Sequence, residues 1–140
     1  MNEDLARALA AEEAAIYAYG IIGVHLSGTA QTLARSAEAD HRARRDQLVS
    51  RLDELKASPA PAPAGYDLPF PVTDKETALK LAIQVEDGVA QAWRATLAAT
   101  SGTDRAVSLA ALSGAAIQAV RWRRAAGVAP LTMAFPGRPA

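Results

Sequence analysis

Five of the chain's eight prolines fall within residues 58–73, SPAPAPAGYDLPFPVT, between two stretches that contain none. Because proline lacks a backbone N–H and disrupts helices, this segment cannot be helical throughout. At ~3.1 Å per extended residue the segment reaches about 50 Å, whereas a helix of about 29 residues is roughly 43 Å long. The segment is therefore long enough to connect opposite ends of a helical bundle.

On both sides of this segment, apolar residues recur every three or four positions, which is the spacing of helices that bury one face. This spacing and the turn residues predict helices over about residues 3–26, 29–57, 74–100 and 103–126. Thr73 and Glu76 match a capping box at the start of the third helix. We predict an all-α, single-domain four-helix bundle over residues 1–140, formed by two antiparallel hairpins joined by the crossover 58–73.

The tail, residues 127–140, is expected to lie extended over the bundle, because Gly127 and Pro130 stop the last helix. Its three large apolar side chains are candidate anchors to the core: Leu131, Met133 and Phe135.

The composition excludes several classes of protein. With 15 basic and 15 acidic residues the formal net charge is zero, which disfavours nucleic acid as a partner. The absence of cysteine excludes disulfides, thiolate metal sites and cysteine nucleophiles. No apolar run approaches ~20 residues and the chain does not open on a basic segment, so we expect a cytoplasmic protein without a membrane partner.

Polar side chains interrupt the apolar seam of each predicted helix. Glu38 and His41, three residues apart, share a stripe of the second helix, and Glu12 and Glu86 lie in the seams of the first and third helices. Tyr19 is interpreted as a packing residue, and Trp93 and Trp122 as core or dimer contacts. The predicted buried polar network comprises Glu12, Glu38, His41, Arg45, Glu86, Gln118 and Arg121.

Part of this set resembles the di-iron carboxylate site of the ferritin-like superfamily, in which two helices each supply a Glu and two supply Glu-x-x-His. The alanine-rich hairpins, the HRARRD stretch, the proline crossover and the terminal AFPGRP also resemble a small, uncharacterised ("domain of unknown function") family of bacterial ferritin-like proteins. The resemblance implies a ferritin-like fold but no activity. If a metal is bound, the resemblance implies iron or manganese held by Glu12, Glu38, His41 and Glu86.

The fourth helix departs from the metal-binding pattern. Where a second Glu-x-x-His is expected, the sequence reads Gln118-Ala-Val-Arg121. An arginine side chain stays charged and has no lone pair to give, so it would repel a dication.

The register of the first hairpin also differs from the metal-binding pattern. Counted from the turn near residue 28, Glu12 is displaced from Glu38 and His41 by roughly 4 to 9 Å along the hairpin. Glu12 is instead nearly level with Arg44 and Arg45.

Three interpretations of the seam residues remain. The first is a metal-free network in which Arg45 and Arg121 neutralise the carboxylates and His41 bridges them, since isolated buried charges cost several kcal/mol. The others are a single metal ion, or a dinuclear iron or manganese centre of an oxidoreductase or ferroxidase. We favour the metal-free network without a cofactor, with a structural or ligand- or partner-binding role, and expect a homodimer.

Overall fold

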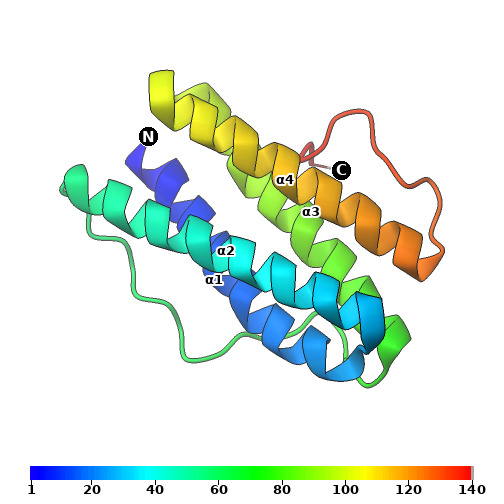
Figure 1. The fold of residues 1–140 in the computed structure, drawn as a ribbon. Helices are drawn as coiled ribbons and strands as arrows, with labels where there is room; N and C mark the ends of the chain where they lie inside the picture. Colours follow the sequence, from blue (N-terminus) through cyan, green and yellow to red (C-terminus); the bar gives the residue numbers. More distant parts are fainter. Residues whose placement is uncertain (140) are drawn as a thin grey trace.

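The computed structural model describes residues 1–139 and contains four α-helices, with no strand in that range (Figure 1). The all-α class is therefore confirmed, and the helix bounds agree with the predicted ones to within a few residues. Helix α1 spans Asn2–Ile22 and continues as a short 3-10 turn, η1, over Gly23–His25. The other helices are α2 (Gly28–Glu54), α3 (Lys75–Ala99) and α4 (Gly102–Ala126).

Helix α2 ends three residues before the predicted position 57. Lys56 adopts a left-handed backbone conformation with φ of 58°. The N–H of Ala57 then donates to the carbonyl of Leu52 at 2.9 Å, and that of Lys56 donates to the carbonyl of Asp53 at 2.9 Å. These bonds satisfy carbonyl groups of the last turn, so the helix terminates there.

Helix α3 begins with a capping box, but one residue later than predicted. Asp74, rather than Thr73, is the N-cap, and its carboxylate accepts a hydrogen bond from the Thr77 N–H at 2.8 Å. The Thr77 hydroxyl accepts one from the Asp74 N–H at 3.2 Å. Thr77, rather than Glu76, therefore closes the box, which satisfies two N–H groups that the helix leaves free.

The helices form two antiparallel pairs, α1 with α2 and α3 with α4, and α1 also packs against α3 (Figure 1). Helices α2 and α4 contact each other only sparsely. The segment between α2 and α3 runs along the α1–α2 pair to its opposite end, where α3 begins beside η1 (Figure 1). Leu68, Phe70 and Val72 of this segment pack against the core.

The tail crosses the α3–α4 pair, but not through the anchors expected from the sequence. Met133 and Phe135 are exposed, and Leu131 is only partly buried. The buried position is Gly137, which has a φ of 77°; a Cβ there would lie 2.5 Å from the carbonyl oxygen of Ala90. Glycine lets the tail approach α3 closely, because it tolerates positive φ and has no side chain.

Two apolar clusters form the core, one toward each end of the bundle, and the buried carboxylates and His41 belong to neither. The cluster that includes the N-terminal half of α1 contains Leu5, Ala8, Leu9, Ala15, Leu48, Leu52, Val89, Ala90, Trp93, Ala111, Leu112 and Ala115. The cluster around the α1–α2 turn contains Ala18, Tyr19, Ile22, Leu26, Ala34, Ala37, Ala78, Leu79, Leu81, Ala82 and Trp122.

Candidate functional site

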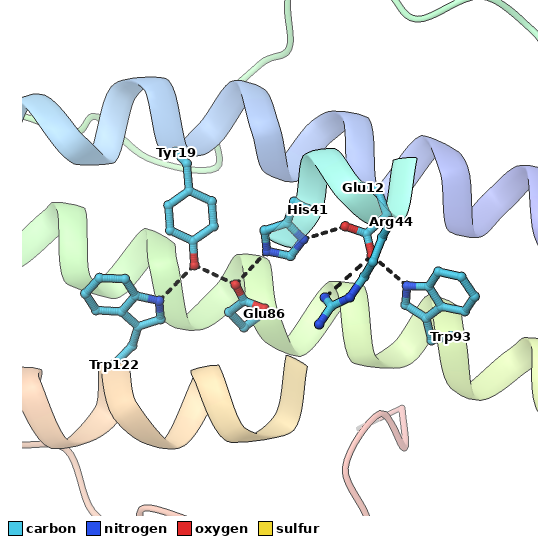
Figure 2. Close-up of polar contacts among 7 residues, drawn as sticks. All are labelled: Glu12, Tyr19, His41, Arg44, Glu86, Trp93 and Trp122. Carbon is cyan, nitrogen blue, oxygen red and sulfur yellow. Dashed lines mark hydrogen bonds and ion pairs between the residues drawn. The ribbon is translucent and has the colours of Figure 1, made fainter. Parts of the chain in front are cut away.

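A histidine bridges two carboxylates at the centre of the bundle (Figure 2). The Nδ1 atom of His41 on α2 lies 2.5 Å from Oε2 of Glu12 on α1. Its Nε2 atom lies 2.7 Å from Oε1 of Glu86 on α3. All three side chains are at most 1% exposed, so both hydrogen bonds are shielded from solvent.

Hydroxyl and indole groups extend this bridge in both directions (Figure 2). The Tyr19 hydroxyl donates to Glu86 Oε1 at 2.6 Å and accepts from the indole N–H of Trp122 at 2.8 Å. At the other end, the indole N–H of Trp93 donates to Glu12 Oε1 at 2.7 Å. A continuous hydrogen-bonded chain therefore crosses all four helices.

The surroundings of His41 favour its protonated form. A histidine donates from both ring nitrogens only in its protonated form, and an acceptor oxygen lies beside each nitrogen of His41. Burial by itself lowers the pKa of His41, but the hydrogen bonds to Glu12 and Glu86 and their negative charges raise this pKa to about 9. These contacts therefore favour the imidazolium form of His41 at neutral pH.

Tyr19 is held in its protonated form. Burial, followed by the negative charge of Glu86, raises the pKa of the Tyr19 hydroxyl well above its usual range. The hydroxyl therefore acts as a fixed hydrogen-bond donor to Glu86 and as an acceptor for Trp122.

Arg44 supplies a second positive charge. Its Nη1 atom lies 3.8 Å from Glu12 Oε1, and its side chain is 17% exposed. The guanidinium packs directly against Gly114 on α4, where a Cβ would collide with Nη2 of Arg44. Glycine at position 114 thus leaves room for an arginine, and the two carboxylates are balanced by two cations.

Three residues predicted in the network lie outside it. Glu38 is 28% exposed and pairs with Arg42 at 3.2 Å, and Arg45 is 33% exposed and pairs with Asp46 at 3.0 Å. Arg121 is exposed.

The rotation of the helix faces explains these corrections. Helix α2 buries positions 34, 37, 41 and 48, so Ala37 and Arg44 face inward in place of Glu38 and Arg45. The predicted stripe, with Glu38 and Arg45, and the observed stripe, with Ala37 and Arg44, both contain His41. A spacing of three or four residues fits either stripe, so the sequence pattern does not distinguish them. On α4 the buried residues after Gln118 are Ala119 and Trp122, so Arg121 points outward.

Four contributors were not assigned to the network from the sequence. The sequence alone predicts packing for Tyr19 and core or dimer contacts for Trp93 and Trp122, although buried Tyr and Trp usually find hydrogen-bond partners. Arg44 was considered level with Glu12 but was not placed in the buried stripe. The position of Arg44 along α2, level with Glu12, was therefore a signal in the sequence that Arg44 could contact the network.

Two buried acceptor atoms have no hydrogen-bond partner among the described residues: Oε2 of Glu86 and Oε1 of Gln118. Gln118, on α4, is buried as predicted. Within residues 1–139, no group of three or more His, Asp or Glu side chains is arranged to hold a metal ion. No helix in that range combines the length and apolar character needed to cross a membrane.

The two adjacent arginines of α2 provide a matched test of the network. Arg44→Ala is expected to lower the free energy of unfolding by about 1–2 kcal/mol, because it removes a cation and packing beside the buried Glu12. Arg45→Ala should change it by no more than about 0.5 kcal/mol, since its ion pair is solvated. Urea denaturation of both variants measures the difference; equal effects would place Arg44 outside the network.

The fold and this site define an all-α, four-helix protein with a buried carboxylate–histidine network at its centre. The chain belongs to the family described as "Domain of unknown function (DUF4439)", whose model matches residues 4–140. It is similar to the crystal structure of a conserved hypothetical protein, rv2844, from Mycobacterium tuberculosis, with 37% sequence identity and a TM-score of 0.85. That match covers 89% of this chain and 95% of the other. No match is found among curated proteins.

Proposed function

We propose that this protein is a ferritin-like, non-enzymatic four-helix domain in which a metal-free ion network stands where relatives of that fold hold two metal ions. The network's role is structural: it fixes the relative positions of the helices, so that the bundle presents its surfaces for binding. The observation that carries the proposal is that both ring nitrogens of His41 are engaged by carboxylates.

The donor set supports this proposal over a dinuclear centre. A histidine that ligates a metal gives the lone pair of one ring nitrogen, whereas both ring nitrogens of His41 lie within hydrogen-bond distance of a carboxylate oxygen. Glu38, the expected partner ligand, faces outward toward Arg42. The oxygens left without partners, on Glu86 and Gln118, number fewer than the four or more ligands that transition metals usually take.

Charge supports the same proposal. Glu12 and Glu86 are balanced by the imidazolium of His41 and the guanidinium of Arg44. A dication would add two positive charges to a set that is already neutral, in an interior where such an excess is costly. Binding a metal through a ring nitrogen would require that nitrogen of His41 to give up its hydrogen bond to a carboxylate.

Metal content tests the proposal. Tag-free protein produced with added iron and manganese, then reconstituted anaerobically with Fe(II), is expected to contain less than about 0.1 metal atom per chain after desalting. His41→Ala serves as the comparison, because a histidine-dependent metal site would be lost in that variant. One or two iron or manganese atoms per chain, lost in His41→Ala, would favour the oxidoreductase or ferroxidase alternative instead.

A homodimer is part of the same proposal. Leu109 and Ile117 are exposed on α4, and the stretch between Arg105 and Arg121 contains no charged residue. An uncharged helix face of this kind suits self-association, in which the same surface meets its own copy.

A further inference from the structure

A groove opens where α2 and α4 separate, at the end of the bundle that contains the start of α1. Its volume is about 460 Å³, which is the size of a small-molecule site. The apolar part of its lining comes from three helices and the α1 terminus: Leu5, Leu48, Trp93 and Val107. The groove adjoins the ion network through Trp93, but its lining does not include His41, Glu12 or Glu86.

Among the charged side chains of the lining, carboxylates outnumber cations. Asp46, Glu54 and Asp104 contribute carboxylates, and Arg51 is the one basic side chain in the lining formed by residues 1–139. The guanidinium of Arg51 is already occupied. It binds both oxygens of Asp104, at 2.8 and 2.9 Å, and Oε2 of Glu54 at 2.9 Å.

This arrangement leaves one excess negative charge at the groove. The pair Glu54 and Asp104 outnumbers the single cation Arg51, and Asp46 is neutralised by Arg45 at 3.0 Å. An anionic ligand would find Arg51 already bound to two carboxylates. A ligand with a positive charge would complement the rim, and its apolar part would cover Leu48, Trp93 and Val107.

We propose that the groove between α2 and α4 binds a small amphipathic amine, with its apolar body against Leu48, Trp93 and Val107 and its ammonium group beside Glu54 and Asp104. The proposal is independent of the metal content of the ion network, because the ligand contacts the groove and not His41. Binding of the ligand would be detectable at Trp93, whose indole N–H is bonded to Glu12.

The test uses n-octylamine as the probe, with n-octanol and octanoate as probes of equal chain length and different head groups. Isothermal titration calorimetry at pH 7.5, below micelle-forming concentrations, is expected to show saturable binding of octylamine at least tenfold tighter than that of octanoate or octanol. In NMR spectra, octylamine should shift the indole N–H resonance of Trp93 more than that of Trp122. The Trp122→Phe variant assigns the two resonances.

Two exposed valines give a matched pair of variants. Val107→Phe fills the groove and is expected to weaken octylamine binding at least tenfold, whereas Val49→Phe, on the exposed surface of α2 outside the lining, should leave it unchanged. Glu54→Gln should weaken it several-fold. The proposal is overturned if no saturable binding occurs, if octanoate or octanol binds as well as octylamine, or if Val107→Phe has no larger effect than Val49→Phe.

Discussion

Replacing His41 with alanine is expected to lower the free energy of unfolding by about 3–5 kcal/mol, the largest effect of any single substitution in the network. The change leaves Glu12 and Glu86 buried without the group that donates a hydrogen bond to each of them. It also opens a cavity that neighbouring side chains fill only partly. In thermal denaturation, the midpoint should fall by roughly 10–20 °C.

Glu38→Ala is the matched control for this substitution, because Glu38 precedes His41 by one helical turn on α2. Its carboxylate is partly exposed and pairs with Arg42 at the surface. We expect a change of no more than about 0.5 kcal/mol. If His41→Ala changed the free energy of unfolding as little as Glu38→Ala, the bridge would contribute little to stability. The proposal of a structural role would then be wrong.

The second large effect is a loss of stability at alkaline pH. The folded-state pKa of His41 is raised from 6.5 to about 9, so the folded state binds the proton more tightly than the unfolded chain. The corresponding stabilisation is fully present below about pH 6.5 and disappears as the pH rises through 9; its size is about 3 kcal/mol. Urea denaturation between pH 6 and pH 10 should reveal this decline.

His41→Gln provides the control for the pH dependence. Glutamine retains a polar side chain but does not titrate, so the variant should be less stable at neutral pH and show a nearly flat profile between pH 6.5 and 9. His25 remains present in both proteins, which separates its contribution from that of His41. A decline of equal size in His41→Gln would assign the pH dependence to another group.

The helices were predictable because each is specified locally. Proline marks the crossover, glycine and serine mark the turns, and apolar residues repeat at helical spacing along every element. Depth along a helix was readable only in part. Glu12 was expected level with Arg44, and the two side chains lie 3.8 Å apart. Glu12 was also expected to be displaced from His41, but the His41 side chain reaches Glu12 Oε2 at 2.5 Å. Boundaries were less accurate, because the Asp74–Thr77 box and the left-handed Lys56 depend on backbone geometry.

The rotation of each helix was not predictable to the accuracy that the site requires. Positions 37 and 38, or 44 and 45, differ by about 100° around a helix, and either choice fits a spacing of three or four residues. The structure selects Ala37 and Arg44, and the space for Arg44 comes from Gly114 on another helix. Such a relation between distant residues is not contained in the periodicity of either helix.

The groove between α2 and α4 also could not be predicted from the sequence patterns. It lies between these helices, beside the two hydrogen bonds through which Arg51 on α2 binds Asp104 on α4. The spacing of apolar residues predicts which face of a helix is buried, but not how far apart two helices lie.

The central claim is that a protonated His41, rather than a metal ion, joins Glu12 and Glu86. The most direct measurement is the protonation state of His41 by nitrogen-15 NMR of histidine-labelled protein between pH 6 and pH 10. We predict that both ring nitrogens show the imidazolium signature at neutral pH and lose it only near pH 9. A neutral ring at pH 7, with one nitrogen carrying a lone pair, would contradict the claim and leave His41 free to ligate a metal.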